Sequence, residues 1–211
     1  MDTKMSSILS DALKEMMTIG TGHAVDAIAQ MVQRKVMIHV PQVDLVPINI
    51  IPDRIGKKRW NEEVIVGLYF KMLGDLSGDI LLVFSKESAD KISGMLFEDF
   101  VLPDMMKNIQ EQENMRQSAL MEVGNILVNS YLNALASITD MKLFPSVPHY
   151  AEDVLGAVFD YLLIHISMTS NTALYMETEF VVEGASLSGD LLIFPDFASM
   201  EKILEKLGLK S

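Results

Sequence analysis

A carboxylate and a side-chain amide stand at helical spacing in the second half of the chain. Asn125 follows Glu122 by three residues, and Ser118 precedes Glu122 by four. Residues three or four apart lie on the same face of a helix, so the three side chains form one polar stripe. At neutral pH the Glu122 carboxylate only accepts hydrogen bonds, whereas the Asn125 amide both donates and accepts them. Such a pair can anchor a cationic group and orient a water molecule.

Hydrolysis of an acyl phosphate is the reaction that this pair suits best. The phosphoryl group is already activated, so the main demand on the protein is to hold water in line with the leaving oxygen. Asn125 is the candidate for that role, and Glu122 is the candidate anchor for a Lys or Arg of a partner. The alternative is that the stripe is only a solvated helix surface.

The pattern occurs twice, at an offset of 107 residues (125 − 18). The positions of the first copy and their counterparts are Asp11 and Ser118, Glu15 and Glu122, Thr18 and Asn125, and Pro41 and Pro148. A second matched block begins at residue 76 in the first copy and at residue 187 in the second, an offset of 111 (187 − 76). The two blocks predict one domain of residues 1–211 built from two repeats, about 6–105 and 110–208.

Hydrophobic periodicity predicts the elements that position these residues. Long helices are expected over residues 6–33 and 110–138, with Gly20 and Gly22 closely packed against a neighbour. Shorter amphipathic stretches span 85–96 and 195–207, and residues 53–63 form a polar loop. Strands are expected at 36–40, 64–72, 76–84, 142–147, 157–167, 172–182 and 186–194. The expected fold class is α/β (α+β), a mostly antiparallel central sheet with two long motif-bearing helices related by a pseudo-twofold axis.

The segment 122–135, Glu-Val-Gly-Asn-Ile-Leu-Val-Asn-Ser-Tyr-Leu-Asn-Ala-Leu, resembles the second active-site helix of the CheC chemotaxis phosphatases. The family motif D/S-x3-E-x2-N-x22-P is met in full by Ser118, Glu122, Asn125 and Pro148. Residues 19–24 resemble the small-residue pattern of the family's other site. The resemblance covers nearly the whole chain.

The resemblance implies a CheC-like fold and a protein aspartyl-phosphate phosphatase that acts on a CheY-like response regulator. Glu122 would contact a lysine of the regulator, and Asn125 would orient the attacking water. The Mg²⁺ of the reaction would be held by the regulator and no cofactor by this chain. The receptor deamidase CheD is a further candidate partner.

The first copy departs from the family motif. Thr18 stands where the motif has Asn, and a hydroxyl is shorter than an amide and has a single donor. The site of Glu15 and Thr18 is therefore expected to be degenerate, binding without catalysis. His23 also replaces a residue that is usually Asn in the family, and a partly buried polar contact is expected there.

Composition excludes several other classes. The net charge of −12 disfavours nucleic-acid binding, which needs clustered Lys and Arg, and the absence of Cys excludes disulfides and thiolate metal sites. The N-terminus lacks the apolar run of a signal peptide, and the apolar stretch 154–168 is too short to span a bilayer. A cytoplasmic location without membrane attachment is expected.

Other catalytic motifs are missing. His23, His39, His149 and His165 are far apart in the sequence and show no metal-ligand spacing, so no metal site is expected. The chain has no G-x-S-x-G elbow and no complete dinucleotide-binding glycine motif. The remaining alternative to a phosphatase is a non-catalytic CheC-like module that binds or sequesters a response regulator or CheD.

Overall fold

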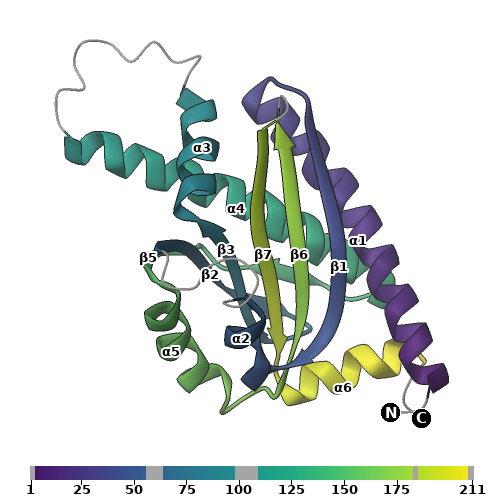
Figure 1. The fold of residues 1–211 in the computed structure, drawn as a ribbon. Helices are drawn as coiled ribbons and strands as arrows, with labels where there is room; N and C mark the ends of the chain where they lie inside the picture. The colour runs from purple at the N-terminus through teal and green to yellow at the C-terminus, as the bar shows by residue number, and fades with distance from the viewer. Residues whose placement is uncertain (1–2, 56–63, 98–108, 183–184, 209–211) are drawn as a thin grey trace.

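The computed structural model describes residues 3–55, 64–97, 109–182 and 185–208. Helices and strands follow one another along the chain as drawn in Figure 1. The elements are α1 (Thr3–Val32), β1 (Val36–Pro47), the 3-10 turn η1 (Ile48–Ile50), α2 (Ile51–Ile55), β2 (Val64–Gly74), β3 (Gly78–Ser85), α3 (Lys86–Phe97), α4 (Ile109–Thr139), β4 (Leu143–Pro145), β5 (His149–Val154), α5 (Leu155–Ile166), β6 (Thr172–Val182), β7 (Ala185–Pro195) and α6 (Phe197–Lys206).

The described strands form one sheet in the order β1-β6-β7-β3-β2-β4, and β5 also pairs with β2. Every described pair is antiparallel. The hairpin β6–β7 from the second half of the chain lies between β1 and β3 from the first half. The two halves therefore share one sheet and alternate within it.

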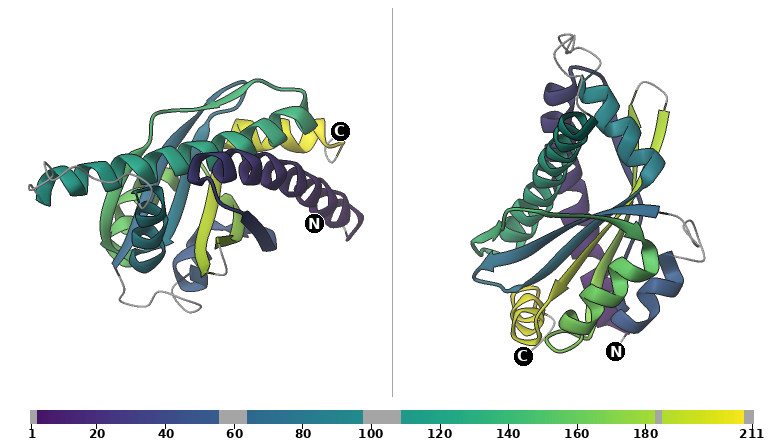
Figure 2. Two further views of the ribbon diagram at one scale, coloured as in Figure 1. Left: turned by 90° about the horizontal axis from the view of Figure 1, so that it is seen from above. Right: turned by 90° about the vertical axis from the view of Figure 1, so that its left-hand side faces the viewer.

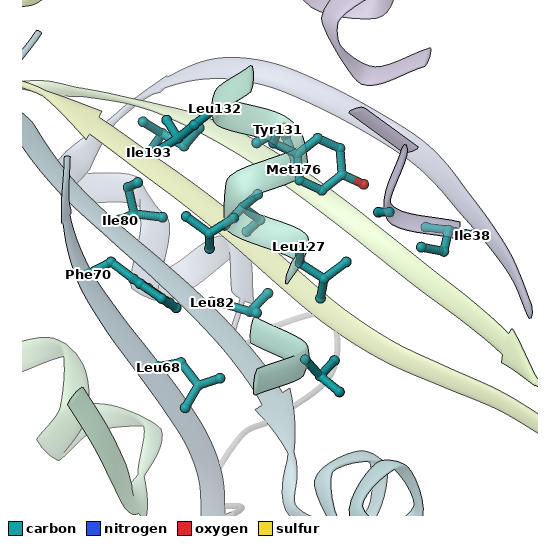
Figure 3. Close-up of a cluster of buried hydrophobic side chains, with 14 of the residues drawn as sticks. Ile38, Leu68, Phe70, Ile80, Leu82, Leu127, Tyr131, Leu132, Met176 and Ile193 are labelled. Carbon is teal, nitrogen blue, oxygen red and sulfur yellow. The ribbon is translucent and has the colours of Figure 1, made fainter. Parts of the chain in front are cut away.

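The long helices α1 and α4 cover one face of the sheet, and the short helices α2 and α5 cover the other (Figures 1 and 2). Each face has its own apolar cluster. On the α4 side, Leu127, Tyr131 and Leu132 point from the helix toward strand residues such as Phe70 and Ile193 (Figure 3). The helical stripe and the strand faces exclude water from each other, and burial of this apolar area stabilises the layers.

Most of the predicted architecture is confirmed. The mostly antiparallel sheet and the two long helices are present, and the helices begin and end within three residues of the predicted bounds. The hairpins β2–β3 and β6–β7 and the amphipathic helices α3 and α6 also lie where the sequence predicts them. β1 is longer than predicted because a β-bulge between His39 and Gln42 accommodates Pro41, which lacks an N–H.

The predicted strand at 157–167 is wrong, because these residues form α5. Leu155, Val158, Phe159 and Ile166 are buried at helical spacing, while Asp160 on the opposite side is exposed. Apolar runs of this length are ambiguous between strand and helix, and one-sided burial decides here for the helix.

Three smaller differences concern short elements. The predicted strand at 142–147 is reduced to β4, and β5 was not predicted because most of its side chains are exposed. Part of the predicted polar loop 53–63 belongs to α2, and the rest of it, 56–63, lies outside the described residues.

The expectation for the two helical glycines holds for one of them. A Cβ on Gly20 would lie 2.4 Å from Cδ1 of Tyr131, so the absence of a side chain lets α1 approach α4. Gly22 is exposed, and a Cβ there would meet nothing within 4 Å. Close packing therefore explains Gly20 and does not explain Gly22.

Candidate functional site

An open groove runs along the polar stripe of α4. Ser118, Glu122, Asn125 and Asn129 line one side of it, together with Met121. These positions are separated by three or four residues, so they share one face of the helix. The segment Phe144–Pro148, which follows α4 in the chain, forms the other side. Helical spacing thus correctly predicted that Ser118, Glu122 and Asn125 lie together, and the motif proline, Pro148, lies opposite them.

The sheet holds α4 close on its far side. Gly124, next to Asn125 in the chain, is buried, and a Cβ there would lie 2.4 Å from Cδ1 of Leu68 on β2. Leu120, Val123 and Leu127 of the same helix face are also buried in this contact. The helix is therefore fixed in its rotation about its own axis, with the polar stripe facing outward.

The opposite wall of the groove is fixed by the first hairpin. β4 pairs with the end of β2, where Leu73 lies opposite Phe144. Beyond β4, the backbone N–H of Ser146 donates to the Lys71 carbonyl at 2.9 Å, and the Ser146 hydroxyl accepts from the Lys71 N–H at 2.9 Å. These bonds keep the wall segment at a set distance from β2.

The turn between β2 and β3 is hydrogen-bonded to the start of this wall segment. The backbone N–H of Asp75 donates to the Lys142 carbonyl at 2.9 Å, and the Asp75 carboxylate accepts from the Lys142 N–H at 2.8 Å. Gly74 has a φ of 113°, which favours glycine, and a Cβ there would lie 2.1 Å from the Lys142 carbonyl oxygen. The wall of the second motif thus rests on a turn from the first half of the chain.

Glu122 and Asn125 differ in their environment. Glu122 is exposed, and no cation among the described residues pairs with it. Asn125 is half-buried, and its side-chain oxygen accepts a hydrogen bond from Nδ2 of Asn129 at 3.0 Å. The carboxylate is therefore available to an external cation, and the amide is already held on one side.

Two hydroxyls of the motif positions are used within their own helices. The Ser118 hydroxyl donates to the Asn114 carbonyl at 2.8 Å, and the Thr18 hydroxyl donates to the Lys14 carbonyl at 2.9 Å. Each bond spans four residues, the usual back-bonding of a helical hydroxyl. Ser118 and Thr18 can still accept hydrogen bonds, but their single proton is engaged.

The first copy of the motif lies on α1. Asp11, Glu15 and Thr18 are all exposed on this helix, as predicted from their spacing. Pro41 lies in β1, at the bulge. On α1, Glu15 therefore stands at the position of Glu122. Thr18, whose hydroxyl donates back to its own helix, stands at the position of Asn125.

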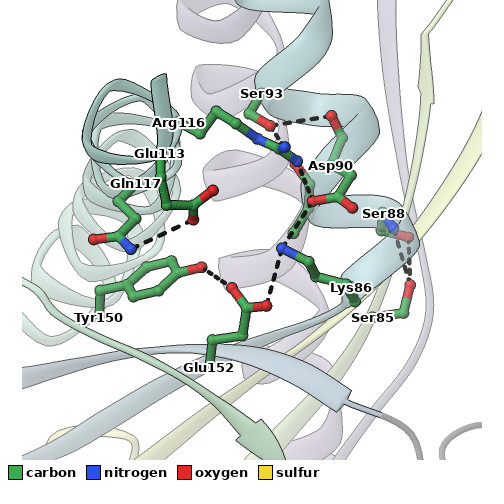
Figure 4. Close-up of polar contacts among 11 residues, drawn as sticks. Ser85, Lys86, Ser88, Asp90, Ser93, Glu113, Arg116, Gln117, Tyr150 and Glu152 are labelled. Carbon is green, nitrogen blue, oxygen red and sulfur yellow. Dashed lines mark hydrogen bonds and ion pairs between the residues drawn. The ribbon is translucent and has the colours of Figure 1, made fainter. Parts of the chain in front are cut away.

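A polar network ties the N-terminal half of α4 to its neighbours (Figure 4). Arg116 of α4 pairs with Asp90 of α3, and Lys86 bridges Asp90 at 3.1 Å and Glu152 of β5 at 3.0 Å. The Tyr150 hydroxyl donates to Glu152 at 2.6 Å. Burial raises the pKa of Tyr150, and the bond to Glu152 raises it further, so the phenol stays a donor. The network holds α4 against α3 and β5 at the end of the helix that precedes the groove.

Metal ligation finds no support within the described ranges. No three His, Asp or Glu side chains there converge in a way that could hold a metal ion. Glu152, near His149 in the chain, is instead bonded to Tyr150 and Lys86. His23 is exposed on α1, so the expected partly buried contact is wrong. None of the helices described is both long and apolar enough to cross a lipid bilayer.

Comparisons with known proteins agree with the two-motif organisation. A model of the CheC-like family matches residues 8–44 and 115–149, which include all eight motif positions. A protein described as CheY-P phosphatase CheC, from Bacillus subtilis (strain 168), is 32% identical over 202 residues, covering 94% of this chain and 93% of that protein.

Solved structures match the fold over its full length. The crystal structure of FliY from Thermotoga maritima has a TM-score of 0.68 at 18% identity and covers 100% of this chain and 99% of that chain. A chain of the FliM–SpeE complex from H. pylori has a TM-score of 0.63 at 12% identity, covering 99% and 96%. At these identities the likeness shows the shared fold.

Proposed function

The chain belongs to the CheC-like family, and from this premise we propose that it is a phosphatase that hydrolyses the aspartyl phosphate of a CheY-like response regulator. The Bacillus subtilis relative, which matches along nearly its whole length, is described as a CheY-P phosphatase. The observation that carries the proposal is the groove in which Glu122 and Asn125 lie side by side on the outer face of α4.

The proposed reaction divides between these two residues. Asn125 hydrogen-bonds the attacking water and holds it in line with the phosphorus, so that the P–O bond to the aspartate breaks as the bond to water forms. Glu122 pairs with a lysine of the regulator and sets the depth of α4 in the regulator's phosphorylated pocket. Positioning of this kind supplies most of the catalysis in phosphoryl transfer, because the protein forms no covalent bond. The Mg²⁺ of the reaction would be held by the regulator, where it would neutralise charge on the phosphoryl oxygens.

The rim of the groove suits a protein partner. Phe144 is 55% exposed and Val147 is 81% exposed, and both line the groove opposite the polar stripe. Apolar side chains beside a charged anchor are typical of protein interfaces, where the apolar centre is buried and the charge sets the register. The regulator's pocket rim would cover Phe144 and Val147 when α4 enters it.

The first copy is proposed to dock without catalysis. Thr18 has no amide and directs its proton to its own helix, so it is a poor holder of water. Glu15 keeps the anchoring carboxylate on an exposed face. The second candidate function, a module that only binds a regulator or CheD, therefore applies best to α1.

Turnover separates the phosphatase from the binding module. Radiolabelled phospho-CheY is incubated with far less than one equivalent of the protein, and its decay is compared with its spontaneous rate. A phosphatase accelerates the loss of the whole pool of label, whereas a binding module protects it or leaves it unchanged. The absence of acceleration would contradict the proposed function.

Two substitutions assign the roles. Asn125→Ala is expected to lower kcat by roughly 100-fold or more with little change in KM, because a donor to the reacting groups is lost. Glu122→Gln is expected to raise KM roughly 10-fold, because it leaves the partner's lysine without its counter-charge. Asn133→Ala, on the same helix two turns after Asn125 and exposed, is the matched control. Half of the wild-type rate in Asn125→Ala would mean that α1 contributes catalysis.

A further inference from the structure

Asn129 follows Asn125 by one helical turn and makes two hydrogen bonds to it. Its Nδ2 donates to the backbone carbonyl of Asn125 at 2.8 Å and to the side-chain oxygen of Asn125 at 3.0 Å. Both side chains line the groove. One amide therefore touches another, and the one that accepts the hydrogen bond, Asn125, is the proposed catalytic residue.

The two bonds determine which end of each amide faces which way. A backbone carbonyl only accepts, so the part of Asn129 that faces it must be the NH₂ group. The same NH₂ faces the Asn125 side chain, which must therefore present its oxygen to Asn129. The NH₂ of Asn125 is left over, and no group among the described residues accepts a hydrogen bond from it. It is the end of the amide available to the groove.

We infer that Asn129 is a positioning residue, which holds the Asn125 amide so that its NH₂, and not its oxygen, faces the phosphoryl group and the attacking water. The inference rests on the proposed phosphatase function. A free asparagine amide can turn over, since its two ends have nearly the same size. With Asn129 in place, the turned amide would bring two NH₂ groups together and lose a hydrogen bond. The preferred orientation gives a donor toward phosphoryl oxygens, which carry negative charge.

The first copy lacks both members of this pair. The offset of 107 places Thr18 at the position of Asn125 and Gly22 at the position of Asn129 (129 − 107). Gly22 is exposed, and a side chain there would meet nothing within 4 Å, so packing does not require a glycine. The loss of the catalytic amide and of its holder in the same copy fits a pair that works as a unit.

The test uses two variants of Asn129 in the full chain and steady-state hydrolysis of phospho-CheY. Asn129→Ala removes both bonds, and Asn129→Asp keeps the shape but offers only acceptors, which turns the Asn125 amide around. Both are expected to lower kcat roughly 10-fold, with KM changed less than about two-fold and with the fold retained, because the orientation of the reacting group is lost. Asn133→Ala should match the wild type.

Each result bears on the inference. A kcat equal to the wild type in both variants would overturn it, as would a rise in KM with kcat unchanged, which would place Asn129 in the docking surface. If Asn125→Ala is inactive while the Asn129 variants are fully active, the phosphatase function stands and only the positioning role fails. Full activity of Asn125→Ala would remove the catalytic role of Asn125 and the inference with it, and only the absence of turnover by the wild type would remove the proposed function itself.

A gain of function on α1 gives an independent readout. In the Asn125→Ala background, Thr18→Asn is compared with Thr18→Asn combined with Gly22→Asn. The combined variant is expected to turn over phospho-CheY several-fold faster than Thr18→Asn alone, because the new amide is held in place. Equal rates from the two, including no turnover from either, would count against the inference.

Discussion

Glu152 is a carboxylate whose neighbours favour its charged form. It accepts hydrogen bonds from the Tyr150 hydroxyl and from Lys86. Partial burial alone would raise its pKa, but the bonds from Tyr150 and Lys86 outweigh burial, and the pKa lies below the ordinary value for glutamate. The ionised carboxylate therefore stabilises the junction between β5 and α3.

This lowered pKa gives a stability that depends on pH. The folded protein binds a proton on Glu152 less readily than the unfolded chain, so the contribution is fully present above the ordinary pKa of about 4.5 and is lost as the pH falls through the lower folded pKa. The difference in free energy of unfolding between wild type and Glu152→Gln should be constant near neutral pH and should shrink in acid. Urea denaturation at a series of pH values measures it. Glu205→Gln on the exposed end of α6 is the control. If its difference in free energy of unfolding from the wild type shrank in acid as much as that of Glu152→Gln, the assignment would be contradicted.

Residue positions on a helix could be predicted from the sequence, but contacts between their side chains could not. The spacing of Ser118, Glu122 and Asn125 was sufficient to place them on one face. The pairing of Asn125 with Asn129 was not predicted, although two asparagines four residues apart were a signal for it. Whether such neighbours bond to each other depends on their rotamers, which the pattern of residue types does not determine.

Among the elements, α1 and α4 depend on glycines for their closest contacts. Gly20 lets α1 lie against Tyr131 of α4, and the Thr21 and Tyr131 hydroxyls are hydrogen-bonded at 3.2 Å in the same contact. Gly124 does the same for α4 against β2. The position of both motif stripes relative to the sheet is therefore set at two points where a methyl group does not fit.

A pair of alanine substitutions measures this closeness. Both Gly20→Ala and Gly22→Ala gain helix propensity, roughly 1 kcal/mol each. Only Gly20→Ala forces a methyl group into Tyr131, which costs about 1–3 kcal/mol. Gly22→Ala should raise the free energy of unfolding. The free energy of unfolding of Gly20→Ala should be lower than that of Gly22→Ala by the cost of the clash with Tyr131. Thermal and urea denaturation compare the three proteins, and equal stabilities would show that the interface adjusts without strain.

Helices and strands could be predicted where the hydrophobic pattern extends over many residues, and not where the segment is short. The thirty residues of α1 give many turns of evidence, whereas α5 has twelve, rich in residues that also favour strands. β5 lies against β2 through its backbone and exposes most of its side chains, so it carries no hydrophobic alternation. An element held mainly by main-chain bonds leaves little trace in the sequence.

At the scale of the molecule, the groove is assembled from both halves of the chain. α4 and the wall Phe144–Pro148 come from the second half, and the turn at Gly74 and Asp75 that holds the wall comes from the first. The matched sequence blocks predicted two copies, but they did not predict which strands become neighbours. Strand order is decided by long-range pairing, for which a single sequence offers no local signal.

The two hydrogen bonds between Asp75 and Lys142, at the start of the wall segment, can be tested through activity. Asp75→Ala removes the acceptor for the Lys142 N–H and is expected to cost about 0.5–1.5 kcal/mol of stability. It should also raise the KM for phospho-CheY several-fold while kcat changes little, because the wall moves and Asn125 does not. Asp75→Asn keeps an acceptor oxygen and should behave as the wild type. A fall in kcat alone would show that these hydrogen bonds act on α4 instead.

The interleaved strand order separates what evolution can change from what it must keep. Because β6 and β7 lie between β1 and β3, damage to the strands of either half would break the sheet of both. The outward stripes of α1 and α4 contribute little to that sheet and can drift independently. Under the proposed function, one chain can keep catalysis on the ridge of α4 while the ridge of α1 acquires a different binding specificity, a combination that usually requires two genes.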